Sequence, residues 1–134
     1  MYEKYVVKAW EEKGEIQKEP YKREIKPLFT MDKCGIEEFM LNITFIDPYS
    51  RTQYHKHVLA EAIYVVSGRG EAVLGEERYQ LEPDIAFYVP KEVFHQVINK
   101  TAETLKLVNV FAPAMYRDEH KKKTVIAVIP KKKR

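Results

Sequence analysis

The sequence predicts an all-β protein, built as a sandwich or a barrel. Short runs rich in β-branched and aromatic residues recur along the chain, turn residues separate them about every 8–12 residues, and helical periodicity is almost absent. The length of 134 residues fits one domain. A hydrophobic share of 45% is enough to fill a core, which excludes a globally disordered chain.

The expected strands from residue 36 onward end at recognisable turn residues. A strand over 38–47 stops at Asp47-Pro48, and one over 62–67 stops at Gly68. The segments 71–74 and 77–81 flank Gly75-Glu76, which predicts a tight hairpin. Further strands are expected over 85–89, 94–99, 104–111 and 125–129.

Composition divides the chain into an N-terminal arm (1–35), a barrel (36–116) and a basic C-terminal segment with a short strand (117–134). The arm is highly charged and interrupted by Pro20 and Pro27, and we expect one strand in it around 24–30. Such an arm buries too little apolar area to fold alone. We therefore expect it to belong to the same domain or to pack on a partner subunit, and we expect residues 131–134 to be frayed.

Charge and cysteine content restrict the compartment and the partners. Residues 117–134 carry a net charge of +6, whereas the rest of the chain is mildly acidic, which argues against a broad nucleic-acid-binding face. The longest stretch without a charge, residues 107–116, is too short to span a membrane. The single cysteine, Cys34, excludes an internal disulfide, and no signal peptide is apparent. We expect a cytoplasmic protein without membrane or nucleic-acid partners.

The histidines are spaced as metal ligands would be. His55 and His57 are separated by one residue, so a strand would place both on one face, and a regular strand or a short bend would bring Glu61 to the same face. His95 lies in a separate expected strand. Three imidazoles and a carboxylate suit Fe, Mn, Ni, Cu or Zn as divalent ions. The alternative is that these are structural histidines. We expect His120, in the charged C-terminal segment, to be exposed and not a ligand.

Two segments resemble the motifs of the cupin superfamily. Residues 55–68 match the first motif, HxH, three residues, Glu, six residues, Gly, and residues 90–99 match the proline, histidine and asparagine of the second. With the flanking strands, the resemblance covers about residues 36–113. It implies a conical β-barrel (a double-stranded β-helix, or jelly roll), usually a homodimer. It also implies one divalent transition metal per chain, Fe or Mn being favoured over Ni, Cu or Zn, on His55, His57, Glu61 and His95.

The chain departs from the family motif at two glycine positions. Asp84 stands where the second motif opens, and Glu92 stands two residues after the motif proline. Because glycine favours tight turns, we expect another turn geometry at both positions. Neither departure removes a metal ligand.

The resemblance favours an enzyme, most of all a metal-dependent dioxygenase acting on a small oxygen-rich molecule. One alternative is a cupin that only binds a metal or a small ligand. Another is a sugar or sugar-phosphate isomerase, for which Arg51, Lys56 and Arg69 would hold a phosphate. Tyr88 and Glu92 are the side chains that we expect near the mouth as proton carriers. The fold alone does not choose among these chemistries, and the sequence does not identify the substrate.

Overall fold

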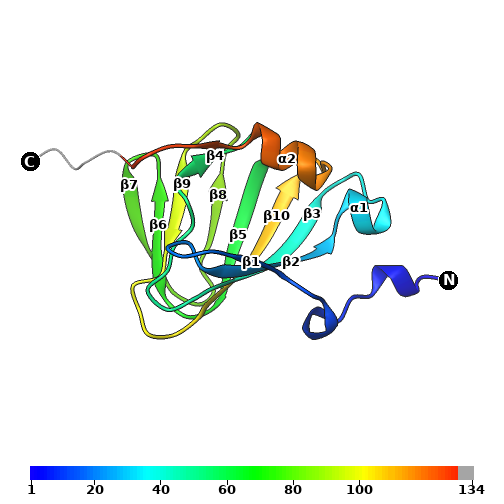
Figure 1. Cartoon of the computed structure of the whole chain (residues 1–134), viewed down its shortest axis with the longest axis horizontal. Coiled ribbons are helices and arrows are strands. Elements are labelled where there is room, and N and C mark those ends of the chain that lie inside the picture. The colour runs from blue at the N-terminus through cyan, green and yellow to red at the C-terminus, as the bar shows by residue number, and fades with distance from the viewer. Residues whose placement is uncertain (130–134) are drawn as a thin grey trace, which may run out of the picture.

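Two antiparallel β-sheets face each other in the computed structural model, which describes residues 1–129 (Figure 1). The first sheet has the order β1-β2-β3-β10-β5-β8 and the second has the order β11-β4-β9-β6-β7. The strands of the first sheet are β1 (Glu15–Gln17), β2 (Arg23–Phe29), β3 (Met40–Ile46), β5 (Ala60–Ser67), β8 (Ala86–Val89) and β10 (Leu105–Ala112). Those of the second are β4 (His55–Lys56), β6 (Gly70–Leu74), β7 (Glu77–Leu81), β9 (His95–Ile98) and β11 (Val125–Ile126). The prediction of an all-β fold is confirmed.

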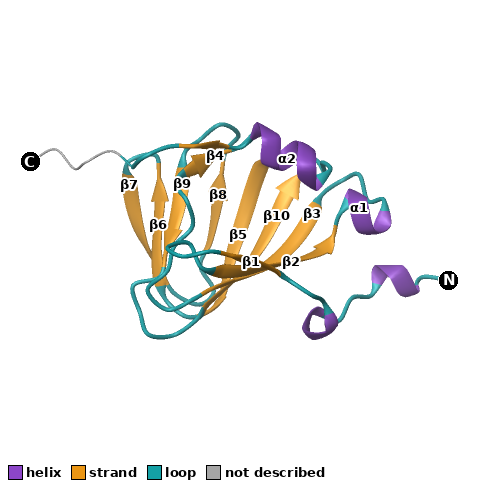
Figure 2. Ribbon diagram, viewed as in Figure 1, coloured by secondary structure: helices purple, strands orange, loops and turns teal. Residues whose placement is uncertain are grey.

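In the described part of the chain, helical structure is confined to short segments at the periphery (Figure 2). Two 3₁₀ turns, η1 (Glu3–Tyr5) and η2 (Ala9–Glu11), lie in the arm, and α1 (Met31–Cys34) follows β2. The helix α2 (Arg117–Lys123) was not expected from the sequence, because it has no apolar periodicity. Acidic residues in its first turn and basic residues in its last turn suit the helix dipole, which favours a helix here. None of the helices in residues 1–129 is long and apolar enough to cross a membrane.

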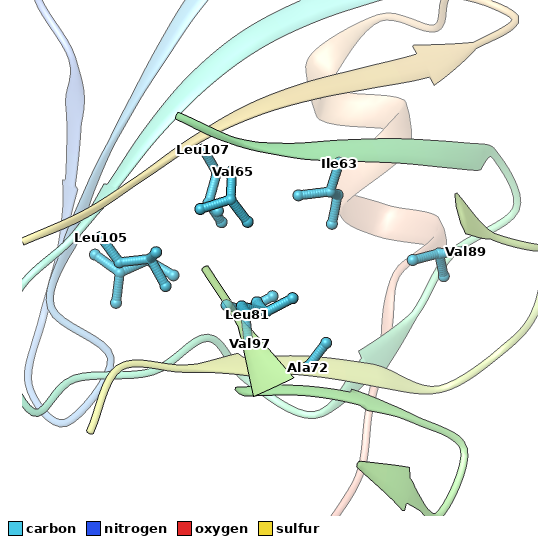
Figure 3. Packing of buried hydrophobic residues seen from close by; sticks show 9 residues of the cluster. Ile63, Val65, Ala72, Leu81, Val89, Val97, Leu105 and Leu107 are labelled. Carbon is cyan, nitrogen blue, oxygen red and sulfur yellow. The ribbon is translucent and has the colours of Figure 1, made fainter. Parts of the chain in front are cut away.

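The core lies between the sheets because inward and outward side chains alternate along each strand. Side chains from both sheets point toward one another there (Figure 3). The inward side chains include Ile63 and Val65 on β5, Val97 on β9, and Leu105 and Leu107 on β10, and on β8 they are Phe87 and Val89. The buried cluster consists of Ile46, Ile63, Val65, Ala72, Leu81, Val89, Val97, Leu105 and Leu107.

The N-terminal arm contributes two strands to the first sheet. β2 corresponds to the strand expected around 24–30 and pairs with β3, and an additional strand, β1, pairs with β2. Exposed apolar residues precede them, including Trp10 with 77% of its surface exposed. Packing of this arm on a partner subunit, and the division into three segments, stay predictions. The expected fraying at 131–134 concerns residues outside the described part.

Our expectation of a different turn geometry at Asp84 and Glu92 is wrong. Both residues keep the left-handed backbone that glycine favours, with φ of 72° and 64°. The Glu92 amide donates a hydrogen bond to the His57 carbonyl at 2.9 Å, and the Asp84 amide donates to the Val65 carbonyl at 2.9 Å. These bonds hold the turns although a left-handed non-glycine residue costs about 1 kcal/mol or more.

Glu71 on β6 is a buried carboxylate held by two cations. It accepts hydrogen bonds from Arg78 at 2.5 Å and from Lys100 at 3.2 Å. Burial favours a higher pKa, but the two cations outweigh it and lower the pKa of Glu71 below its usual value of 4.5. The ionised form therefore stabilises the fold above that value, and this contribution is lost as the pH falls through the pKa of the folded state.

We predict that Glu71→Gln lowers the free energy of unfolding by about 1–3 kcal/mol near neutral pH, because the two cations lose their charged partner. The difference from the wild type should shrink as the pH falls below 4.5. Urea unfolding followed by circular dichroism at both pH values tests this. Glu77→Gln on the adjacent strand is the control, since its exposed carboxylate contacts only Tyr79 among the described ion pairs and hydrogen bonds. A difference that grows on acidification would contradict the prediction.

Candidate metal centre

Four motif residues meet between the two sheets. His55 lies on β4 and His95 opens β9, and the two are direct partners across this strand pair. His57 follows β4 at a bend, and Glu61 lies on β5 in the opposite sheet. Glu61 therefore reaches the histidines after a bend in the chain, and the possibility of one regular strand through all three residues is wrong.

The three imidazoles form one compact group. A ligand atom of each of the residues His55, His57 and His95 lies within 4.8 Å of those of the other two. The ring centroids of His55 and His95 are 4.2 Å apart, and those of His57 and His95 are 4.9 Å apart. Glu61 approaches two of the rings, since its Oε1 lies 3.1 Å from His57 Nε2 and 3.4 Å from His95 Nε2.

Each ring is oriented by a bond to a backbone carbonyl two residues away. The Nδ1 atoms of His55, His57 and His95 lie 2.7, 2.7 and 2.9 Å from the carbonyl oxygens at positions 53, 59 and 93. A carbonyl only accepts, so each Nδ1 carries the hydrogen. In a neutral ring this leaves the lone pair on Nε2.

The group therefore consists of hydrogen-bond acceptors that face one another. His95 Nε2 is buried without a hydrogen-bond partner. His57 Nε2 and Glu61 Oε1 are 3.1 Å apart, and neither carries a hydrogen when the ring is neutral and the carboxylate is ionised. A divalent cation would satisfy these atoms together, and a second bond from Nδ1 to a carbonyl is typical of metal-binding histidines. The donor set fits a transition metal.

The protonation states favour the same interpretation. Burial, and then the neighbouring His95, lower the pKa of His55 to about 3, so this ring is neutral at physiological pH. Burial raises the pKa of Glu61, whereas hydrogen bonds and positive charge from His57 and His95 lower it to about 2. These rings have that effect only with a proton on the Nε2 that faces the carboxylate; with neutral rings protonated at Nδ1, a bound cation would take the place of that proton. Glu61 is thus a buried carboxylate that stays ionised.

Glu61 is also oriented by side chains on the neighbouring strands. Asn109 Nδ2 on β10 donates a hydrogen bond to Glu61 Oε2 at 2.9 Å, and Thr44 on β3 donates to Asn109 Oδ1 at 2.7 Å. All three residues are buried. One carboxylate oxygen is therefore fixed by Asn109 while the other faces the histidines. The sequence motif does not include Asn109 or Thr44. Only inward alternation on the strands points to them.

The centre opens into a cavity of about 380 Å³. Apolar side chains form much of its inner wall, among them Ile25, Ile63, Val97, Leu107 and Phe111. Strand β1 and helix α2 line its other side, so the arm and the C-terminal segment both border the site. In Figure 1, α2 lies at the upper end of β10 and β5. The volume is within the range of small-molecule sites.

The expectation that His120 is exposed is wrong. It is half-buried, lines the cavity, and its ring lies 5.1 Å from that of His57 and 5.2 Å from that of Phe111. Burial is the main cause that lowers the pKa of His120 to about 4. Within residues 1–129, the histidine cluster that could hold a metal ion consists of His55, His57 and His95 and does not include His120. Helix α2 carries His120 to the cavity, and no local pattern in the sequence indicates this placement.

The basic residues expected to hold a phosphate do not line the cavity. Arg51 lies over the ring of Tyr21, Lys56 approaches Glu92 at 3.5 Å, and Arg69 pairs with Glu82. Cations at the cavity come from other segments, namely Arg23, Arg117 and Lys121.

The expected proton carriers also lie elsewhere. Tyr88 is 60% exposed and lies at an outward position of β8. Glu92 is exposed and bound to Lys56, and neither residue lines the cavity. Cys34 donates from its Sγ to the Thr30 carbonyl at the end of α1.

Comparisons with known proteins agree with this fold. The uncharacterized protein MJ1618 of Methanocaldococcus jannaschii is 28% identical over 96 residues, which cover 63% of this chain and 77% of that protein. The polyketide cyclase RemF of Streptomyces resistomycificus has a TM-score of 0.71 at 22% identity, over 86% of this chain and 87% of its own.

Two further solved structures share the fold at lower identity. A predicted oxalate decarboxylase of Thermotoga maritima has a TM-score of 0.74 at 17% identity, over 81% of this chain and 98% of its own. A cupin-superfamily sugar phosphate isomerase of Silicibacter pomeroyi has a TM-score of 0.68 at 18% identity, over 81% and 76%. The family described as the cupin domain matches residues 43–111, just over half of the chain. Family match, two-sheet topology and a three-histidine cluster together show that this chain belongs to the cupin family.

Proposed function

We propose that the protein is a metal-dependent enzyme in which His55, His57, His95 and Glu61 hold one divalent transition metal, Fe or Mn being favoured. The observation that carries this proposal is the convergence of buried acceptor atoms whose orientation is fixed by backbone carbonyls. Such a metal supplies a Lewis acid with positions left for substrate oxygens, and as Fe(II) it reacts with O₂.

Dioxygenase-type chemistry on a small oxygen-rich molecule is the reaction that we favour. The cavity borders the histidines directly, so a substrate there would reach the metal position. Its apolar wall, with Ile63, Leu107 and Phe111, limits the access of water around that position. Asn109 keeps Glu61 oriented as the substrate enters, because it binds the carboxylate oxygen that faces away from His57.

A protein nucleophile is not needed for this proposal. The Nε2 atoms of the three histidines would be occupied by the metal, and their Nδ1 hydrogens are bound to backbone carbonyls. These rings therefore have no free site for proton transfer. Cys34 lies at the end of α1, outside the cavity lining.

Two rival functions remain in the same fold. The protein could bind a metal or a small ligand without catalysis, or it could isomerise a sugar or a sugar phosphate. The names of the structural relatives include a cyclase, a decarboxylase and an isomerase, so the fold supports different reactions. Elemental analysis of the purified protein, followed by O₂ uptake with candidate substrates, separates these functions. Bound Fe with substrate-dependent O₂ uptake would support the dioxygenase.

We also propose a homodimer that pairs through the outer face of β5 and β8. Tyr64, Val66 and Tyr88 expose 42%, 38% and 60% of their surfaces on this face. Such apolar surface is typical of subunit interfaces. Light scattering of the full chain and of Tyr88→Glu tests the interface, since a charge there should favour the monomer.

We predict that His57→Ala lowers the affinity for Mn²⁺ or Fe²⁺ at least about tenfold, because a buried ligand is removed from a four-ligand site. Metal content after dialysis and titration calorimetry measure this effect. Chelation should abolish any turnover of the wild type, whereas Cys34→Ser should keep both metal and turnover. Full metal occupancy in His57→Ala would refute the ligand assignment.

We predict that Asn109→Ala weakens metal binding about 10- to 100-fold, because Glu61 loses the bond that orients it. Asn42→Ala is a matched control, since Asn42 is a buried asparagine directly opposite Asn109 on β3 and its Oδ1 has no hydrogen-bond partner. The control should bind metal as the wild type does. Equal losses in the two variants would indicate a general packing effect instead.

A further inference from the structure

Arg23 is a cation on the cavity wall that lacks an acidic partner. It lies at the start of β2 and is half-buried. Within residues 1–129, the one side-chain hydrogen bond of Arg23 runs from Nη1 to the Tyr21 carbonyl at 2.9 Å, and no carboxylate lies within ion-pair distance. A guanidinium has five N–H donors, so most of its bonding capacity is unused by the protein.

Leaving a cation in this environment has a cost. Burial lowers the pKa of Arg23, which reflects the loss of water around its charge. A partly buried charge is usually paired, because transfer from water is unfavourable without a partner. A residue that only stabilised the fold would be expected to have a carboxylate beside it. Arg23 instead borders a partly open cavity that is large enough for a ligand.

The other charges of the cavity do not neutralise Arg23. Glu15 on β1 forms ion pairs with Arg117 and with Lys121 at 3.7 Å, so this carboxylate is already shared by two cations. The remaining acidic residue of the lining is Glu61 at the histidines. Among residues 1–129, the lining thus contains three cations and two carboxylates, and a divalent metal would add further positive charge. This balance favours an anionic ligand.

The sheet register separates Arg23 from the histidine centre along the cavity. Arg23 pairs with Ile46 at one end of β3, whereas Asn109, which holds Glu61, pairs with Asn42. Four residues of strand correspond to about 13 Å. Between these levels, Ile25 and Leu107 contribute apolar side chains to the lining. A ligand that bridges both ends would have a carbon segment between two polar ends.

We propose that the cavity takes an anionic substrate, a carboxylic acid or a phosphate ester, whose oxyanion binds Arg23 while oxygens at its other end reach the His55–His57–His95 centre. This inference rests on the proposed function for the metal end only, because the Arg23 end is defined by its own contacts. A guanidinium binds carboxylate and phosphate groups alike through two parallel hydrogen bonds. Arg23 lies outside the part of the chain that matches the cupin domain, so the selectivity belongs to this chain's own arm.

The test is the binding of malonate, inorganic phosphate and uncharged malonamide to the full chain by titration calorimetry, with Mn²⁺ and after chelation. Variants are Arg23→Met, Arg23→Lys and the control Arg51→Met. Arg51 is an arginine near the same arm, but its guanidinium lies over Tyr21 and does not line the cavity. Circular dichroism and the melting temperature show whether each variant is folded.

We expect malonate or phosphate to bind the wild type, malonamide to bind at least about tenfold more weakly, and Arg23→Met to lose about tenfold or more in anion affinity. Arg51→Met should bind as the wild type does. Should Arg23→Met fail to fold, Arg23→Lys should still bind the anion several-fold more weakly, because it lacks the planar fork. The stronger of the two anions identifies the substrate as an acid or as a phosphate ester.

Equal anion affinity in the wild type and the folded Arg23 variants would overturn this inference, as would malonamide binding as tightly as malonate. Absence of saturable binding of either anion to the wild type would also overturn it. Metal affinity is measured separately on the same variants. If the protein binds metal but anion binding does not depend on Arg23, the Arg23 subsite is refuted and the proposed function is not. If anion binding depends on Arg23 but the protein has no metal affinity, the proposed function is refuted and the subsite is not.

Discussion

The candidate site depends on the bonds between histidine Nδ1 atoms and backbone carbonyls. Each bond spans two residues of the chain, so the local path of the backbone fixes the ring before any ligand arrives. The Nε2 lone pairs of His57 and His95 then face a buried carboxylate, an arrangement that is unfavourable for acceptors alone and favourable around a cation. The facing acceptors therefore cost stability at this point of the fold, and the packing of the surrounding sheets keeps them in place.

Those sheets divide the interior into a packed core and a polar centre. Inward residues of β10 change from Leu105 and Leu107 to Asn109 along one strand, and β5 changes from Val65 and Ile63 to Glu61 in the same direction. The apolar end supplies the burial that stabilises the fold. The polar end receives the side chains that hold Glu61. Because the same strands form both ends, the packed core also holds in place the backbone that carries the side chains of the polar centre.

The apolar end, where Leu105 begins β10, is held by a buried side chain of the second motif. Asn99 donates from Nδ2 to the carbonyls of Ile46, Asp47 and Glu103, and its Oδ1 accepts from the amide and the hydroxyl of Thr101. These contacts join both sheets at the turn before β10. Asn99 of the motif therefore has a structural role, because it binds backbone carbonyls and an amide that would otherwise lack partners. His95 of the same motif belongs to the histidine centre.

The sequence alone determined the fold class, most of the strands and the family motifs, because alternation, turn residues and ligand spacing are local properties. It also singled out His55, His57, Glu61 and His95 as candidate ligands. Only the tertiary structure brought Glu61 from the opposite sheet, fixed it through Asn109, and placed His120 and Arg23 on the cavity. These residues come from an arm and a helix distant in sequence, and no local pattern encodes which cations meet there. Their proximity depends on how the sheets and the helix pack together.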